Sequence, residues 1–393
     1  MMIDLKQKIE ELSQDYFDEL VHIRNHLHKY PELSFREFKT SEYIRTLLDE
    51  WGITYNHPFV ETGILARIDG KQGGKVIALR SDMDALPVTE TVEWENKSAN
   101  KGIMHACGHD IHMASMLGSI RILNKLKDQI NGRVLFVFQP GEEKVPGGAR
   151  LMLEEGIFNE VKPDMIIAQH VFPSMITGKA GFRAGRYMAS SDEIYLTVTG
   201  KGGHGALPEN INDPVLMGAH ILISLQQEIN RKAPKDVPTV LSFGKFIADG
   251  AVNIIPNQVQ IEGTFRTMNE RWRNRAHELI VKIAKGIAYS MDGECKVEIK
   301  KGYPVLYNDE KITAYARRFA IEFLGKDHVE ELDPRMTAED FAWFANAYPA
   351  MMYRLGVKSP NSKEEYALHT PEFRADDQAV RTGASLLLSL IHI

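Results

Sequence analysis

The stretch R-V-L-F-V-F-Q-P-G-E-E (133–143) decides the fold of this chain. Its first six residues are almost entirely apolar, which is typical of a strand that is buried on both faces. The polar turn Q-P-G-E-E follows at once and places two adjacent carboxylates, Glu142 and Glu143, where that strand ends. In open α/β sheets, ligands gather at the carboxyl ends of such strands.

Two further segments repeat this pattern elsewhere in the chain. V-I-A-L-R (76–80) is followed by S-D-M-D, and M-I-I-A-Q (165–169) is followed by His170. Because the carboxyl ends of parallel strands meet at one edge of a sheet, we expect these polar residues to lie close together. Another buried strand is predicted at M-M-Y-R-L (351–355).

Helical periodicity separates the predicted strands. It covers roughly 4–28, 36–51, 112–128 and 148–155. Apolar strands that alternate with helices indicate the α/β class, here a largely parallel mixed sheet flanked by helices.

The pattern changes over residues 187–299. Apolar and polar residues alternate here, as in half-exposed strands, at 191–200, 258–266 and 295–300, and helices are predicted at 213–231 and 271–290. The order strand, helix, two strands, helix, strand is that of a ferredoxin-like α+β domain. We therefore expect a catalytic domain in two parts, 1–186 and 300–393, with an inserted α+β domain at 187–299.

The composition limits the classes of function that the chain can have. The chain has 393 residues, 44% of them hydrophobic and 25% charged, with a net charge of −6 and no long basic run. A nucleic-acid partner is therefore not expected. The absence of a long apolar run and of an apolar leader predicts neither a membrane span nor a signal peptide. Two cysteines exclude a disulfide framework and favour the cytoplasm.

Five scattered residues suit divalent transition metals. They combine one thiolate, three imidazoles and one carboxylate: Cys107, His109, Glu143, His170 and His369. Five ligands are one too many for a closed tetrahedral site, and they suit two metals that share a bridge. Each residue alone has a simpler interpretation, such as an acidic turn or a core or surface histidine, so the prediction depends on the set.

Glu142 is adjacent to the predicted ligand Glu143 and is available as a base. A carboxylate near a metal can take a proton from water and pass it to a leaving nitrogen. This arrangement favours a metal-assisted hydrolase.

Four further residues are candidates for supporting the ligand imidazoles, which need hydrogen-bond partners behind them. They are Asp82, Asp84, His105 and Asp110. For Asp82 and Asp84 the alternative is that Asp84 simply caps a turn.

The inserted domain carries three polar candidates. His204 lies in K-G-G-H-G-A-L-P, where it could donate to a developing oxyanion. Asn253 and Arg266 are the others, and a guanidinium suits a substrate carboxylate. The alternatives are a plain glycine turn for His204 and an ordinary surface arginine for Arg266.

Long motifs in a fixed order resemble those of the M20 metallopeptidase family. The resemblance runs along nearly the whole chain and is closest to the branch of N-acyl-amino-acid amidohydrolases, hippurate hydrolases and auxin-conjugate hydrolases. It is carried by H-L-H-K-Y-P-E-L-S-F (26–35), R-S-D-M-D-A-L-P (80–87), M-H-A-C-G-H-D (104–110), F-Q-P-G-E-E (138–143), G-H-G-A-L-P (203–208), N-I-I-P (253–256), A-E-D-F (338–341) and L-H-T-P-E-F (368–373).

The resemblance implies a zinc-peptidase-like catalytic domain, two divalent metals (Zn, Mn, Co or Ni) and a lid through which relatives dimerise. It implies the five ligands named above, with Cys107 as the bridge and Glu142 as the general base. His204 matches a lid histidine that in dimeric relatives can reach the partner's site, and Asn253 and Arg266 match carboxylate-binding positions. Glu209 stands where the family's lid loop often has a second histidine.

These features together predict a dinuclear metal enzyme that hydrolyses the amide bond of N-acyl amino acids, with a small-molecule substrate and a homodimer formed through the inserted domain. The alternatives are a dipeptidase or carboxypeptidase of the same fold and a catalytically silent metal-binding relative.

Overall fold

The chain folds into two compact units in this computed structural model, which describes residues 2–391. The first unit contains the residues up to 185, 307–333 and those from 340 on. The second contains 186–306 and 334–339. Each unit has its own cluster of buried apolar side chains.

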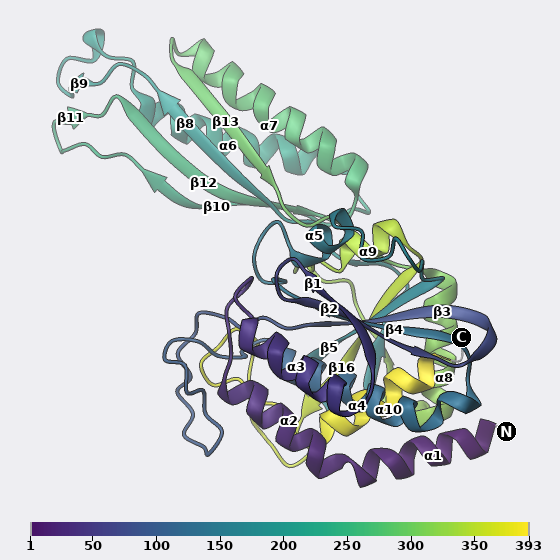
Figure 1. The fold of residues 1–393 in the computed structure, drawn as a ribbon. Coiled ribbons are helices and arrows are strands. Elements are labelled where there is room, and N and C mark those ends of the chain that lie inside the picture. The colour runs from purple at the N-terminus through teal and green to yellow at the C-terminus, as the bar shows by residue number, and fades with distance from the viewer. Residues whose placement is uncertain (1, 392–393) are drawn as a thin grey trace. The chain divides into compact units, whose positions relative to one another are not determined.

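An eight-stranded mixed sheet forms the centre of the first unit (Figure 1). Its strands lie in the order β1 (Thr54–Phe59), β2 (Gly63–Asp69), β4 (Asn131–Gln139), β3 (Lys71–Asp82), β5 (Met165–Ile176), β16 (Ala350–Lys358), β6 (Ala180–Phe182) and β15 (Val329–Glu331). The adjacent strands β4, β3, β5 and β16 run parallel. The predicted α/β fold with a largely parallel sheet is confirmed.

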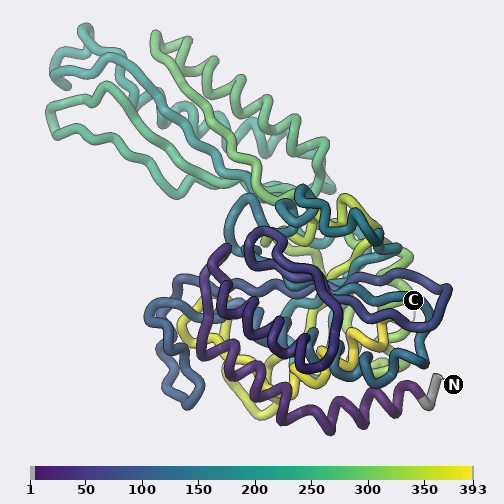
Figure 2. Tube along the Cα trace, viewed as in Figure 1, coloured from purple at the N-terminus to yellow at the C-terminus, as the bar shows by residue number. Residues whose placement is uncertain are grey.

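Helices cover this sheet, so its central strands are buried on both faces. In β16 the residues from 350 to 357 are all buried. The helices are α1 (Met2–Asp15), α2 (Phe17–Lys29), α3 (Phe38–Glu50), α4 (His109–Leu126), α5 (Gly148–Glu154), α8 (Glu310–Leu324), α9 (Ala342–Ala347) and α10 (Gln378–Leu390). Figure 2 shows the N-terminal helix beside the C-terminal one, and α1 contacts α10.

Two predicted elements differ in extent from the sequence expectation. The helix expected over 4–28 is interrupted at Tyr16, whose ψ of 1° leaves the helical range. Both α1 and α2 contact α4 and α10 on their two sides of this break. The strand expected to end at His170 continues to Ile176, because β16 goes on pairing with β5 after β3 has ended.

The second unit has the predicted ferredoxin-like arrangement. Its antiparallel sheet has the order β10 (Thr239–Ile247), β12 (Gln258–Thr267), β8 (Asp192–Thr199) and β13 (Glu294–Lys301). The helices are α6 (Pro214–Lys232) and α7 (Glu270–Ser290). Side chains cap both helix starts: Asp213 accepts from two amides of α6, and Asn269 accepts from one amide of α7.

Short elements complete the chain. The strand pairs β9 (Gly203–His204) with β11 (Ile254–Ile255) and β7 (Gly185–Met188) with β14 (Leu306–Asn308) form separate two-stranded sheets, and η1 (Lys127–Gln129), η2 (Pro208–Asn210) and η3 (Lys326–His328) are 3₁₀ turns. Among residues 2–391, no helix is long and apolar enough to cross a membrane.

Candidate metal centre

The ends of the parallel strands bring the predicted ligands together in the first unit. Asp82 ends β3 and pairs with Gln139, the last residue of β4. In β5, Ala168 pairs with Arg80, so His170 reaches the same level of the sheet two residues later. The convergence expected from the strand pattern is therefore what the structure contains.

Cys107 lies at the centre of the five predicted ligands. Its Sγ atom is 3.6 Å from Nε2 of His170 and 3.3 Å from Nε2 of His369. Glu143 Oε1 lies 3.2 Å from Nε2 of His369 and 4.0 Å from Nε2 of His109. All five candidate ligands thus share one small region.

The five residues fall into two groups whose ligand atoms lie within 4.8 Å of one another. One group is Cys107, His109 and His170, and the other is Cys107, Glu143 and His369. The thiol is common to both. The geometry therefore offers two three-residue sites that meet at one sulfur atom.

Backbone hydrogen bonds orient two of the imidazoles for metal binding. Nδ1 of His109 donates to the carbonyl of Asp84 at 2.7 Å, and Nδ1 of His170 donates to the carbonyl of Val171 at 2.9 Å. When neutral, each ring therefore presents an unprotonated Nε2. Nε2 of His109 is buried and has no hydrogen-bond partner among the described residues. Such an atom, beside a thiol and a carboxylate, fits a metal ion.

Two local features place the Cys107 segment. Gly108 has a φ of +78°, and a Cβ there would lie 2.5 Å from the side chain of Val171. Only glycine allows this close approach to β5. His369 adopts a φ of +62°, and its amide donates to the carbonyl of Ala106 at 2.8 Å. This bond ties the C-terminal loop to the segment that carries Cys107.

In the metal-free site the surroundings keep Cys107 and His109 protonated and His170 neutral. Burial raises the pKa of the Cys107 thiol well above its usual range, and Glu143, Glu142 and Asp82 raise it further. Burial alone would lower the pKa of His109, but Asp82 and Asp84 outweigh it and raise that pKa to about 10. Burial and the nearby Arg354 lower the pKa of His170 well below its usual range. Carboxyl groups thus surround the candidate ligands, an arrangement that favours a bound cation.

Asp82 connects the site to a buried network. Its carboxylate accepts from Nδ1 of His112 at 2.6 Å and from Arg80 at 2.7 Å. Arg80 also donates to Asp340 and Gln139 at 2.8 Å each. Burial would raise the pKa of Asp82, but His109, His112 and Arg80 hold it well below its usual range. Asp82 therefore stays anionic next to the ligands.

His112 is a residue that the sequence reasoning missed. Its Nε2 accepts the amide N–H of Val171 at 2.9 Å, and its Nδ1 donates to Asp82. Both ring nitrogens are thus used, and burial lowers the pKa of this neutral ring. His112 lies three positions after His109 on α4, on the same face of the helix. The spacing of three residues between the two histidines was the signal in the sequence by which His112 could have been identified.

The two other candidates for supporting residues have different surroundings. Asp110 accepts from Arg24 at 2.9 Å and from Nδ1 of His28 at 2.8 Å. Neither partner is a candidate ligand. His105 is buried with no hydrogen-bond partner for either ring nitrogen among the described residues, and burial lowers its pKa to about 3.

Glu142 lies next to the candidate ligands. It is buried, and a carboxylate oxygen lies within 4.8 Å of ligand atoms of His109 and Glu143. Adjacent residues on the turn thus face the same small region, one as a candidate ligand and one as a candidate base.

The second unit holds the remaining three predicted site residues. His204 and Asn253 are exposed neighbours, because β9 pairs with β11 and the amide of Gly205 donates to the carbonyl of Asn253 at 2.9 Å. Arg266 lies near the far end of β12 and donates to the carbonyl of Met336 at 3.2 Å. Within this unit, the structure brings His204 and Asn253 together and leaves Arg266 apart.

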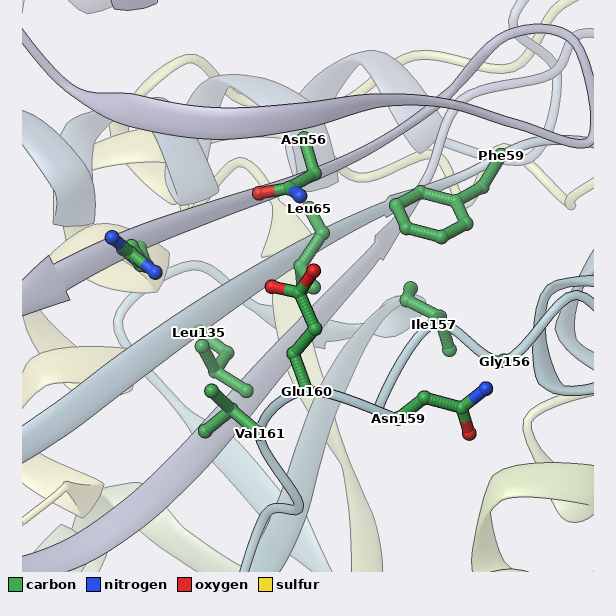
Figure 3. A pocket seen from close by; sticks show the side chains of 10 residues that line it. Asn56, Phe59, Leu65, Leu135, Gly156, Ile157, Asn159, Glu160 and Val161 are labelled. Atoms are coloured by element: carbon green, nitrogen blue, oxygen red, sulfur yellow. The ribbon is translucent and has the colours of Figure 1, made fainter.

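A separate cavity of about 170 Å³ lies in the first unit (Figure 3). It is bordered by β1, β2, β4 and the segment 156–161, with Leu65, Leu135 and Ile157 among its apolar lining residues. Its lining contains neither histidine nor cysteine. It therefore does not belong to the metal site.

Comparisons with known proteins agree with this geometry. The sequence model of peptidase family M20/M25/M40 matches residues 78–393. The chain is 34% identical to the IAA-amino acid hydrolase ILR1-like 5 of Arabidopsis thaliana, over 96% of this chain and 87% of that protein. It is 38% identical to the N-acyl-L-amino acid amidohydrolase of Geobacillus stearothermophilus, over 78% of this chain and 82% of that protein.

A solved structure shows the same likeness. The YXEP protein of Bacillus subtilis, described as a dinuclear metal binding peptidase from the M20 family, superposes with a TM-score of 0.82. It is 31% identical in sequence, and the match covers 96% of this chain and 98% of that one.

Proposed function

The chain belongs to peptidase family M20/M25/M40, and we propose that it hydrolyses the amide bond of N-acyl amino acids, releasing a carboxylate and a free amino acid. It is a hydrolase of the amidohydrolase type. The names of its relatives support the finer substrate class, since two of them act on acylated amino acids.

Two divalent metal ions per chain are part of this proposal. The observation that carries it is the position of Cys107, whose sulfur is common to two groups of three candidate ligands. His109 and His170 would complete one site, and Glu143 and His369 the other. Zn, Mn, Co and Ni all suit this mixture of nitrogen, oxygen and sulfur donors. Bound metal supplies Lewis-acid chemistry, which polarises an amide carbonyl and acidifies water.

Glu142 is proposed as the general base. It would take the proton of the attacking water and deliver that proton to the departing nitrogen, because an amine anion is a poor leaving group. Its burial next to His109 and Glu143 supports this role.

His204 is proposed as the donor to the oxyanion that develops on the substrate carbonyl. Its Nδ1 accepts the amide N–H of Ala206 at 3.1 Å, so the neutral ring carries its proton on Nε2 and can donate it. Arg266 is proposed to pair with the substrate carboxylate, and Asn253 to contact the substrate beside His204.

The separation of these residues supports a homodimer. Gln258 and Arg266 are eight residues apart on β12, which corresponds to roughly 26 Å of extended chain. His204 and Asn253 lie near the Gln258 end, because β11 ends only three residues before Gln258. One small substrate cannot touch both ends of this strand. We therefore infer that one chain provides Arg266 and a second chain provides His204 to each site.

The exposed face of the second unit suits this dimer. β10 is an edge strand with Phe246 and Ile247 exposed, and α6 exposes Leu216 and Ile223. The two α6 residues are seven positions apart and therefore share one face of the helix. An apolar edge strand beside an apolar helix face is typical of a protein–protein interface.

Both cysteines are free thiols, and a thiol ligand suits a reducing compartment, so we place the enzyme in the cytoplasm.

The test is the release of free amino acid from acetyl, benzoyl and indole-acetyl amino acids by Mn- or Zn-loaded protein, with Glu142→Gln and the matching dipeptides alongside. Release from the acylated substrates by the wild type, and a loss of about 10²–10⁴-fold in the variant, supports the proposal. Cleavage of the dipeptides alone would reassign the enzyme to the peptidases. No cleavage with metals bound would favour a silent relative.

The dimer is tested by sedimentation of the wild type and of Ile223→Glu. We expect a dimer for the wild type and a monomer with much reduced activity for the variant. A monomeric wild type with full activity would refute the shared site.

A further inference from the structure

Two buried carboxylates hold the backbone on either side of Glu142. The amide of Gly141 donates to Oε1 of Glu37 at 2.9 Å, and the amide of Glu143 donates to Oδ2 of Asp84 at 3.0 Å. The residue between these two amides is the proposed base. Its backbone is therefore fixed at both neighbours by side chains from distant parts of the first unit.

Glu37 joins three segments of the chain. Besides Gly141, its carboxylate accepts from the amide of Phe35 at 2.9 Å and from the hydroxyl of Thr62 at 3.0 Å. The side chain is fully buried, with a relative exposure of 0%. Burying a carboxylate is costly unless it is well hydrogen-bonded, so this position serves a specific purpose.

Helix capping does not explain Glu37. It occupies the residue before α3, a position where serine, threonine, aspartate or asparagine normally bonds the first amides of the helix. The Glu37 side chain makes no such bond. Glu32 takes over this task, since its carboxylate accepts from the amide and hydroxyl of Thr40 at 2.9 and 3.0 Å.

The segment before Glu37 also packs directly on the turn. A Cβ added to Gly141 would lie 2.3 Å from the ring of Phe35, so only glycine leaves room for that ring. Both residues have a φ of +63°. Ser34 donates to Asp84 at 2.6 Å and thereby supports the second carboxylate of the pair. Residues 34–37 therefore contact the 140–143 turn directly through the Phe35 ring and the Glu37 carboxylate. Ser34 acts indirectly, because the Asp84 carboxylate to which it donates also accepts from the Glu143 amide.

We propose that Glu37 is a positioning residue for catalysis, which places Glu142 by holding the Gly141 amide against the 34–37 segment. This inference rests on the proposed role of Glu142 as the base. The hydrogen bonds of the Glu37 side chain go to Phe35, Thr62 and Gly141, which are not candidate metal ligands. Its loss therefore affects the geometry of proton transfer more than metal content or substrate affinity.

Three variants separate positioning from general stability. Glu37→Ala removes the acceptor of the Gly141 amide. Glu37→Gln keeps a side-chain oxygen that can accept from the Gly141 amide. Its other terminal atom, which faces Thr62, becomes an amide N–H donor in place of a carboxylate oxygen. Glu37→Asp keeps a carboxyl group but withdraws it by one methylene, which provides a second disruptive variant if the alanine variant does not fold. Glu32→Ala is the matched control, because it removes a cap of α3 without touching the turn.

The experiment uses the metal-loaded full chain with the best acylated substrate. For Glu37→Ala and Glu37→Asp we expect kcat to fall by about 10²-fold, since small misplacements of a reacting group have effects of this size. KM and metal content should remain near wild type, and Glu37→Gln should restore kcat to within about 10-fold. Glu32→Ala should keep the wild-type kcat.

Hydrogen–deuterium exchange provides a readout that does not depend on activity. The peptide containing Gly141 and Glu143 should exchange faster in Glu37→Ala than in the wild type, with the second unit unchanged. Normal exchange and normal kcat in both disruptive variants would overturn the inference. If the wild type and Glu142→Gln turn over acylated substrates equally, the proposed base is wrong instead, and faster exchange in Glu37→Ala would then show a purely structural contact.

Discussion

The Sγ atom of Cys107 lies 3.3 Å from Nε2 of His369, although 262 positions separate the two residues in the sequence. The same sulfur lies 3.6 Å from Nε2 of His170. Two histidines from different parts of the first unit thus meet at one thiol. Cys107 is therefore common to both groups of candidate ligands, whereas each of these histidines belongs to one group.

Substitution of Cys107 should affect both proposed metal sites, whereas each of these histidines belongs to only one. We expect Cys107→Ala to lose most of both metals at micromolar total metal. His170→Ala and His369→Ala should each retain about one metal. Metal content after gel filtration, measured by inductively coupled plasma mass spectrometry, distinguishes these patterns. Retention of two metals by Cys107→Ala would contradict the shared-sulfur arrangement.

Metal binding should release protons at neutral pH. Burial and the neighbouring carboxylates raise the pKa of the Cys107 thiol, and Asp82 and Asp84, opposing burial, raise the pKa of His109 to about 10. Both groups are therefore protonated in the metal-free protein and must lose a proton to act as ligands. Apparent metal affinity should increase as the pH rises from 6 to 9. Calorimetric titrations in buffers with different ionisation enthalpies measure the protons released.

Cys107→Ser provides the control for this titration. It removes the thiol proton while keeping the size of the side chain, so it should release about one proton fewer than the wild type when metal binds. An unchanged proton count would mean that the thiol is not a ligand.

His112 should control metal affinity without touching the metal. It joins Asp82 to the amide of Val171, the residue after His170. We expect His112→Phe to weaken metal binding by about 10–100-fold, the usual effect of removing a partner of a metal ligand. His112→Gln can still present an acceptor to the Val171 amide and should lose less. Equal affinities for the wild type and His112→Phe, measured by chelator competition, would refute this role.

The strand pattern of the sequence predicted much of this site. The pairing of adjacent parallel strands brings Asp82, Gln139 and His170 to one level of the sheet whatever the details of the loops, although β5 continues beyond His170. The order of elements over 187–299 likewise predicted the ferredoxin-like unit, because few arrangements of that order bury both helices on one sheet. The roles of the individual side chains remain predictions.

The remaining features depend on tertiary contacts that leave no periodic signal. The placement of His369 requires a left-handed backbone and a bond to the carbonyl of Ala106. Glu37 resembles an ordinary residue at a helix start until its fold brings it to Gly141. The break at Tyr16 lies within a stretch whose periodicity is helical throughout, and the two helices on either side of it both pack on α4 and α10.

Glu37 should make the stability of the protein depend on pH. Burial, together with the nearby Asp84, raises the pKa of its carboxyl from 4.5 to about 7. The folded state therefore binds more protons than the unfolded state between these values, so the contribution of Glu37 to stability is fully present below pH 4.5 and is lost as the pH rises through about 7. The difference between the folded and unfolded pKa values of Glu37 corresponds to roughly 3 kcal/mol in the free energy of unfolding.

Glu37→Gln mimics the protonated carboxyl at every pH and should remove this dependence. We expect the variant to match the wild type below about pH 5, to become more stable than the wild type as the pH rises to about 7, and to keep that advantage up to pH 8. Urea denaturation of the metal-loaded protein, followed by a probe in the first unit, measures the difference at each pH. Glu32→Gln, a change of the same type five residues earlier, controls for the loss of one charge. A difference between Glu37→Gln and the wild type that stays constant from pH 5 to 8, or that grows equally for Glu32→Gln, would show that the Glu37 carboxyl does not titrate in this range.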